Sequence, residues 1–191
     1  LQEADSGSVF LDDLDVLKEK AAVRKILGYL PQEFGVYRNV TAEQLLTHFA
    51  ILKGISSRKE RKAKVEEVLH LTNLFEARKK HVSSYSGGMR QRFGIAQLLL
   101  NNPELIIVDE PTAGLDPEER NRFLNLLSEI GEHIIVILST HLVDDVQELC
   151  TQVGARAAGS PGDAKAVYIG TWRVWRDEFH QVTRLNVVND L

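Results

Sequence analysis

Ser86-Gly87-Gly88-Met89-Arg90-Gln91 and Leu105-Ile106-Ile107-Val108-Asp109-Glu110 are the two stretches that decide the fold of this 191-residue sequence. The first starts with a good N-cap serine and continues with apolar residues at helical spacing, which predicts a helix beginning at Ser86. The second is an uninterrupted apolar run that ends in two carboxylates, and it predicts a buried strand over 105–108. A buried strand directly after a helix is the first sign of an α/β fold.

The residues that follow continue the alternation of helix and strand. Asp116, Pro117 and two acidic residues predict a helix start with a cap, a first-turn proline and favourable charges, and Gly131 predicts its end. A buried strand is expected over 134–138, and Thr140 is expected to cap another helix. Such alternation predicts a parallel sheet covered by helices, with ligands at the carboxyl ends of the strands. Three polar residues are expected at that edge: Gln32, Asp109 and Ser139.

Preceding segments predict further elements. A strand over 26–30 ends at Pro31, and Lys18 to Arg24 is compatible with a helix. A capping-box pattern at Thr41 and a cap at Ser56 or Ser57 predict two helices, ending at Gly54 and Leu71. With the helix that begins at Ser86, they predict an inserted helical subdomain over about 41–100. Residues 8–12 and 16–17 predict a short antiparallel hairpin.

Composition narrows the classes of protein. Twenty-three Lys and Arg against 27 Asp and Glu give a net charge of -4, which argues against nucleic-acid binding. One cysteine, Cys150, is compatible with the reducing cytosol, and no apolar run reaches the roughly 20 residues needed to cross a bilayer. Because the chain starts at Leu1 and its only methionine is Met89, we expect that its beginning is incomplete.

Two groups of residues have the chemistry of a phosphate site. Asp109 and Glu110 end a buried strand, where carboxylate oxygens suit Mg²⁺. Ser86, Gly87 and Gly88 open a helix, where unhindered N–H groups and the helix dipole favour a phosphate. Taken singly, each group has a structural alternative: Asp109 as a turn cap, Glu110 as a solvent-facing carboxylate, and Ser86 as an ordinary N-cap.

Together, the run from Tyr85 to Arg92 and the later Asp-Glu-Pro-Thr at 109–112 resemble the signature and Walker B regions of ATP-binding-cassette (ABC) proteins. Tyr85 and Met89 depart from the usual Leu-Ser-Gly-Gly-Gln. Gln32 resembles the Q-loop glutamine, residues 113–116 the D-loop, and His141 the switch histidine. The resemblance covers residues 6–150 and implies a P-loop NTPase-like α/β fold with only a remnant of the N-terminal antiparallel subdomain. Residues 151–191 form a divergent segment with one family strand at 166–171.

The resemblance implies ATP and Mg²⁺ as ligands and a role for each matched residue. Asp109, with Gln32, would hold Mg²⁺; Glu110 would polarise the attacking water, with Gln32 helping to hold it; and His141 would sense the γ-phosphate. Gln32 would also couple the site to a transmembrane partner through the loop 31–37. Ser86, Gly87 and Gly88 would close over nucleotide bound by the other subunit of a head-to-tail dimer. Asp116 would lie along that seam, although its N-cap position is a sufficient structural role.

A phosphate-binding loop of the form Gly-x-x-x-x-Gly-Lys-Ser/Thr does not occur in the sequence, because none of its 13 glycines precedes a lysine. By resemblance this Walker A segment would precede Ser6, so we expect an N-terminally truncated domain over 1–150. We expect negligible ATP hydrolysis by the chain alone. The same segment includes a central strand in the family, so we also expect unpaired backbone groups in the sheet.

Three functions stay open at this point. The leading one is the ATPase subunit of an ABC transporter, with a run after Ser86 most similar to bacterial exporters. It would be peripheral on the cytoplasmic face of the membrane, beside a transmembrane subunit and a second ATP-binding subunit. The second is a soluble ABC ATPase acting on ribosomes or DNA. The third is a non-enzymatic half-site that offers only Ser86, Gly87 and Gly88 to a complete partner.

Overall fold

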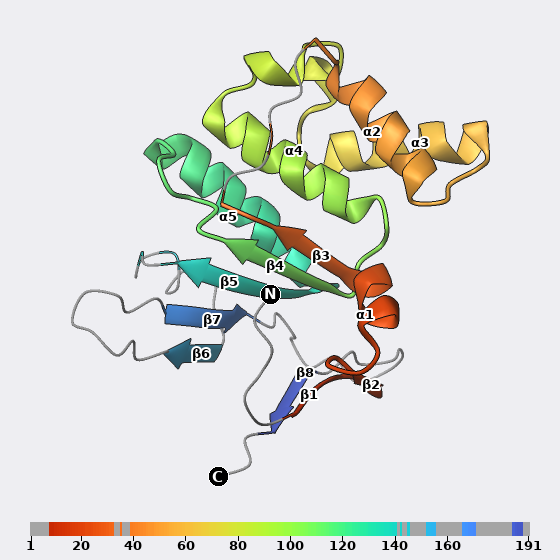
Figure 1. Cartoon of the computed structure of the whole chain (residues 1–191). Coiled ribbons are helices and arrows are strands. Elements are labelled where there is room, and N and C mark those ends of the chain that lie inside the picture. Colours follow the sequence, from red (N-terminus) through yellow and green to blue (C-terminus); the bar gives the residue numbers. More distant parts are fainter. Residues whose placement is uncertain are drawn as a thin grey trace.

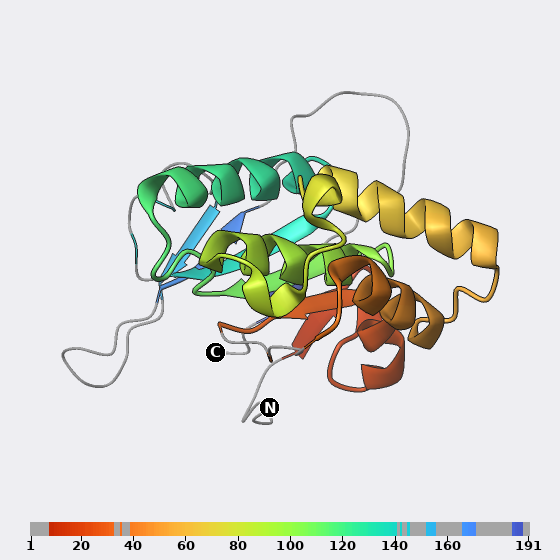
Figure 2. The ribbon, with the colours of Figure 1, turned by 90° about the horizontal axis from the view of Figure 1, so that it is seen from above.

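The structure, a computed structural model, describes residues 8–32, 35, 39–140, 142 and 145, and the backbone of 152–155, 166–170 and 185–188. A five-stranded sheet is covered by the helices on one face, and a small three-stranded sheet lies beyond its other face (Figure 1). Seen from above, α4 (Gly87–Leu99) and α5 (Pro117–Gly131) run over the sheet, and α2 (Ala42–Leu52) and α3 (Arg58–Leu71) extend to one side (Figure 2). Within the described residues, none of the helices is long and apolar enough to span a membrane.

The five-stranded sheet has the order β3-β4-β5-β7-β6. Three parallel strands form its first half: β3 (Leu27–Leu30), β4 (Leu105–Asp109) and β5 (Ile135–Thr140). These confirm the strands and the parallel pairing that the apolar runs predicted. The predicted parallel sheet is confirmed for these three strands, and the sheet continues beyond β5 with antiparallel strands. There β7 (Ala166–Gly170) pairs antiparallel with β5, and β6 (Gln152–Ala155) pairs antiparallel with β7.

The physical reason for this difference is that the edge of a strand can hydrogen-bond to a neighbour of either direction, and many parallel sheets carry antiparallel strands at one side. A continuous apolar run shows that a strand is buried on both faces, but it does not fix the direction of the strand added beside it. Both β4 and β5 have partners on each side. The expected unpaired backbone in the middle of the sheet is therefore not found at these two strands.

The helical subdomain contains α2 (Ala42–Leu52), α3 (Arg58–Leu71) and two 3-10 turns, Phe75–Ala77 and Val82–Ser84. Its predicted caps are confirmed. Thr41 and Gln44 form the reciprocal capping box, and the Ser57 hydroxyl caps α3. Helix α4 (Gly87–Leu99) follows, and it packs on β3 as well as on α2, α3 and α5. One apolar core thus joins the helical subdomain to the sheet, with Phe93 of α4 and Phe123 of α5 fully buried in it.

The second sheet gathers both ends of the described chain. Its strands are β1 (Ser8–Leu11), β2 (Leu14–Asp15) and β8 (Leu185–Val188), with β1 in the middle. The predicted hairpin is present as β1–β2, but its second strand is Leu14–Asp15 and not 16–17. Strand β8 lies in a stretch for which the sequence indicated no element. Leu11 of β1 is fully buried and packs with Leu105 and Ile135, which attaches this sheet to the larger one. The short helix α1 (Lys20–Ile26) connects β2 to β3.

Several sequence predictions fall outside the described residues. They concern His141, Cys150, most of the helix expected after Thr140, and most of the loop 31–37. The last long helix that is described, α5 (Pro117–Gly131), begins and ends where the cap, proline and glycine predicted.

Candidate functional site

Asp109 lies at the carboxyl end of β4, beside the end of β5. The register pairs Asp109 with Ser139, and the Ser139 hydroxyl donates to Asp109 Oδ1 at 2.7 Å. Both residues are half-buried. One carboxylate oxygen is thus held by a neighbouring hydroxyl, while the second oxygen takes no part in that bond. An ordered carboxylate and a hydroxyl at this edge of the sheet are the oxygen donors that Mg²⁺ prefers.

Glu110 is the residue at which the chain leaves the sheet. Its N–H donates to the Ser139 carbonyl at 2.8 Å, and its φ of 47° lies in the left-handed region. A residue with a Cβ is uncommon there, and such a conformation costs about 1–3 kcal/mol. Only 4% of Glu110 is exposed. A buried carboxyl on a strained backbone is found more often at functional sites than elsewhere, which agrees with the role predicted for Glu110.

Gln32 follows β3 at the same edge of the sheet. Leu30 pairs with Val108 in the β3–β4 register, so the chain leaves β3 on the side where Asp109 and Glu110 end β4. The Gln32 side chain is exposed. The described structure therefore places Gln32 at the predicted edge, and it records no hydrogen bond between Gln32 and Asp109.

Ser86, Gly87 and Gly88 form the beginning of α4. The Ser86 hydroxyl accepts a hydrogen bond from the Met89 N–H at 3.2 Å, as an N-cap does. Ser86 and Gly87 are exposed, whereas Gly88 is buried. The positive end of a 13-residue helix therefore faces solvent behind a serine and a glycine, an arrangement that admits an anion to the backbone N–H groups.

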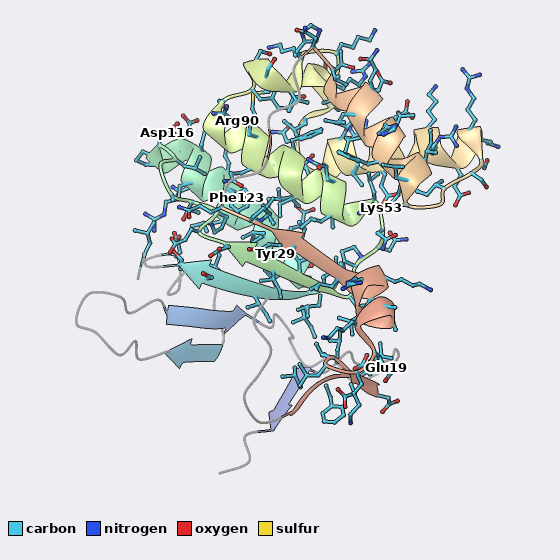
Figure 3. All side chains as sticks on the ribbon, viewed as in Figure 1. Glu19, Tyr29, Lys53, Arg90, Asp116 and Phe123 are labelled. Carbon is cyan, nitrogen blue, oxygen red and sulfur yellow. The ribbon has the colours of Figure 1, made fainter. Side chains whose placement is uncertain are left out.

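The loop 110–116 connects the end of β4 to α5 and reaches the beginning of α4. Gly114 has a φ of 73°, which glycine adopts without strain. Asp116 caps α5, accepting from the Glu119 N–H at 2.9 Å, and Leu115 lies against Gly87. Figure 3 shows Arg90 of α4 and Asp116, the N-cap of α5, at the same end of the molecule. The predicted signature and D-loop residues are thus neighbours, and one short loop leads from them to Glu110.

A buried carboxylate that the sequence did not reveal lies under this loop. Asp145 is fully buried and accepts hydrogen bonds from three side chains: Thr112, Arg120 and Thr140. The Arg120 Nε–Asp145 Oδ1 distance is 2.6 Å. Asp145 therefore ties the loop after Glu110 to the first turn of α5 and to the end of β5. In the sequence, Asp145 is only an acidic residue in a stretch predicted to be helical. Such a residue fits a solvent-exposed position equally well, so its burial could not be predicted.

Tyr85 stands directly before the serine of α4, at the position where the family usually has leucine. Its ring is buried, and its hydroxyl donates to the Ala77 carbonyl at 3.0 Å. Burial raises the pKa of Tyr85 to about 12, although the nearby Arg92 guanidinium acts in the opposite direction. This tyrosine therefore fills the apolar leucine position while its one polar group is satisfied by the 3-10 turn.

We expect this tyrosine to make stability depend on alkaline pH. The folded protein keeps the Tyr85 proton up to about pH 12, while the unfolded chain releases it near pH 10, so the stabilising effect is complete below pH 10 and is lost as pH rises towards 12. Relative to Tyr85→Phe, the wild type should lose about 1–3 kcal/mol of unfolding free energy over this range. Urea unfolding at several pH values tests this, with the exposed Tyr29→Phe as the control; equal pH profiles for wild type and Tyr85→Phe would contradict it.

Comparisons with known proteins agree on one family. Residues 1–113 match the sequence profile of the family described as "ABC transporter". The chain is 41% identical to the uncharacterized ABC transporter ATP-binding protein YxlF of Bacillus subtilis, over 73% of this chain and 47% of YxlF. It is 34% identical to the linearmycin resistance ATP-binding protein LnrL of the same species, over 78% of this chain and 48% of LnrL. The chain thus spans about half the length of these curated relatives.

A solved structure with the same fold is the dimeric post-hydrolysis state of the ATP-binding cassette MJ0796 bound to ADP and Pi. The TM-score is 0.62 at 28% sequence identity, over 75% of this chain and 66% of that one. The observed order of strands and helices therefore matches that of an ATP-binding cassette.

Proposed function

The chain belongs to the ABC transporter family, and from this premise we propose that it supplies the signature and Walker B part of an ATP-binding subunit. Asp109 holds Mg²⁺, directly or through water, with Gln32; Glu110 polarises the water that attacks the γ-phosphate, with Gln32 helping to hold that water; and His141 senses that phosphate. Ser86, Gly87 and Gly88 bind the nucleotide held by a second subunit, with Asp116 beside them. The observation that carries this proposal is the buried, left-handed Glu110 next to the ordered Asp109 carboxylate.

Two features support the proposal that the metal-binding residues and the residues that bind the second subunit's nucleotide form two separate parts of the site. The carboxylates belong to the sheet edge, where the Ser139 hydroxyl fixes Asp109. The signature residues belong to the exposed N-terminus of α4. A face that exposes backbone N–H groups at a helix N-terminus suits the phosphates of a ligand held by another molecule. The similar cassette MJ0796 was solved as a dimer bound to ADP and Pi, which supports a dimer here; the head-to-tail arrangement is part of the proposal.

We further propose a transmembrane subunit as the second partner and a peripheral position on the cytoplasmic face of the membrane. The support is family membership together with the absence of a spanning helix among the described residues. Hydrolysis by these 191 residues alone is negligible in this proposal, since they contain no Gly-Lys pair to position the β- and γ-phosphates.

The binding of nucleotide held by a second subunit is the trans role of Ser86, Gly87 and Gly88. ATP-dependent association of two chains tests this role. The chain is mixed with a family cassette that has a complete phosphate-binding loop and a glutamine at its Walker B glutamate, so that ATP persists. Sedimentation velocity should show a heterodimer with Mg²⁺ and ATP and none without nucleotide. Gly87→Asp should weaken this association at least about tenfold. A carboxylate at position 87 interacts favourably with the positive end of the helix dipole, so the variant should fold normally. The same carboxylate repels the phosphates of the nucleotide, so binding should weaken.

Ser83→Asp is the matched control, because it adds the same charge at an exposed position three residues before Ser86. Its association should equal that of the wild type. If the wild type does not associate in an ATP-dependent manner, or if Gly87→Asp associates as well as the wild type, the trans role is wrong.

A non-enzymatic half-site is the second candidate, because the exposed N-terminus of α4 can bind a partner's nucleotide without any contribution from Asp109 and Glu110. In this version the same association occurs, but Asp109 and Glu110 contribute no turnover. Phosphate release by the heterodimer with an unmodified partner cassette separates the two. If Glu110→Gln leaves the heterodimer's turnover unchanged while Gly87→Asp abolishes it, the half-site is the correct description.

A further inference from the structure

Gly88 lies against Glu119 of α5, across the junction between the two helices. A methyl group on Gly88 would come within 2.9 Å of Glu119 Cβ and 2.8 Å of its carboxyl carbon. Cβ contacts below 3.0 Å essentially do not occur, and Glu119 Cβ is not the flexible end of its side chain. A side chain at position 88 is therefore disfavoured by the packing of this chain itself, independently of any ligand.

Glu119 is itself held from several sides. Its Oε2 pairs with Arg92 Nη2 at 3.1 Å, and the exposed fractions of the two side chains are 17% and 8%. Its N–H is bound by Asp116, and its Oε1 lies 3.3 Å from Arg122 Nη1. The Glu119 side chain thus has little freedom, because its backbone is capped and its carboxylate lies between two guanidinium groups.

Arg92 extends this connection to the helical subdomain. Its Nη1 donates to the Asn73 carbonyl at 3.3 Å and approaches the Thr72 carbonyl at 3.5 Å, just after α3 ends. One buried guanidinium therefore joins α3, α4 and α5. Buried ion pairs of this kind contribute uncertain net stability, but they can fix one arrangement of the elements that they join.

The pair also determines the charge next to the signature glycines. An unpaired carboxylate against Gly88 would repel a phosphate at the α4 N-terminus, whereas the adjacent Arg92 and Arg122 balance its charge. The anion-binding end of α4 therefore depends on Glu119 in two ways. Its side chain sets the spacing between α4 and α5, and its pairing with the two arginines neutralises its negative charge.

We propose that Glu119 is a positioning residue of the nucleotide site. It sets the spacing between the α4 and α5 N-termini, so that Ser86, Gly87, Gly88 and Asp116 meet the nucleotide as one rigid surface. The proposal rests on the trans role given above. Neither a catalytic contact nor a metal contact is assigned to Glu119.

The packing step is tested without nucleotide, by thermal unfolding of the 191-residue chain. Gly88→Ala should lower Tm by about 5 °C in the wild type, by about half as much in a Glu119→Ala background, and not at all in a Glu119→Gly background. Gly87→Ala is the matched control, because its methyl would meet only Leu115 Cδ2 at 3.3 Å. An equal decrease for Gly88→Ala in all three backgrounds would overturn the packing step.

The functional step is tested by ATP-dependent association with the complete partner cassette. Glu119→Ala should raise Kd about tenfold, while Glu119→Gln, which fills the same space and still accepts from Arg92, should raise it no more than about threefold. Glu118→Ala is the control, since Glu118 is one residue away, is 74% exposed and pairs only with Arg122 among the described ion pairs.

The outcomes separate the two proposals. If the wild type shows no ATP-dependent association, the trans function fails, whatever Glu119 does. If the wild type associates and Glu119→Ala matches Glu118→Ala, the trans function stands and the positioning role is wrong. A graded loss, with Glu119→Gln between the wild type and Glu119→Ala, supports the positioning role, because general unfolding would not be rescued by the isosteric side chain.

Discussion

Glu110→Gln should reduce ATP turnover at least about a hundredfold when the 191 residues are placed after a family segment that carries the phosphate-binding loop. Glutamine fills the same buried space but cannot accept a proton from the attacking water. The effect is expected in kcat and not in nucleotide affinity, because the carboxyl acts on water and not on the phosphate chain. Malachite-green detection of released phosphate, beside binding of a fluorescent ATP analogue, measures the two separately.

Two controls accompany this experiment. Glu104→Gln removes a carboxyl at the opposite, exposed end of β4 and should leave turnover unchanged. The 191 residues without the added segment should release phosphate no faster than buffer. Turnover by that unextended chain, if lost in Glu110→Gln, would show that it carries a phosphate site of its own and that the proposed dependence on an added loop is wrong.

Asp145→Ala should lower the free energy of unfolding by about 3–5 kcal/mol. The fully buried carboxylate accepts from Thr112, Arg120 and Thr140, so its removal leaves a guanidinium and two hydroxyls without their acceptor in a poorly solvated place. Urea unfolding followed by circular dichroism measures the loss. Because this network supports the loop 110–116, we also expect the variant to lose ATP-dependent association.

The exposed pair Arg122–Glu118 provides the comparison. Glu118→Ala should cost no more than about 1 kcal/mol, as surface ion pairs usually do. Replacing both Arg120 and Asp145 with leucine should recover a large part of the stability, since both charges of the pair are then removed together. If Asp145→Ala and Glu118→Ala cost the same, Asp145 does not hold the network together.

Most of the helices and the three parallel strands could be predicted because their signals are local. Thr41, Ser57, Ser86 and Asp116 each cap a helix where the sequence indicates one, since capping involves residues only three positions apart. The strands β4 and β5 were recognisable from continuous apolar runs. The elements that the sequence did not reveal, β6 and β8, lie in stretches without clear periodicity. Strand β8 pairs with the distant β1, while β6 pairs with β7, the next strand along the chain.

In the candidate site, too, the residues with local sequence signals could be predicted and those defined by tertiary contacts could not. The motif residues lie where the sequence predicted. The start of α4 contains Ser86, Gly87 and Gly88, the end of β4 is Asp109, and the N-cap of α5 is Asp116. The residues that connect these motifs were not predictable from spacing. Glu119 resembles an ordinary first-turn acidic residue, and only the structure places it against Gly88 and Arg92.

The pairing of β1 with β8 also constrains the order in which a growing chain can fold. Leu11 lies opposite Leu185 in the small sheet, so β1 leaves the ribosome long before its partner strand exists. At about 5–20 residues per second, the 174 positions from 11 to 185 take roughly 9–35 s to synthesise. During that interval one edge of β1 lacks its final partner, although Leu11 can already be covered by Leu105 and Ile135. The small sheet is therefore completed only after β8 has been synthesised, when the rest of the described fold is already available.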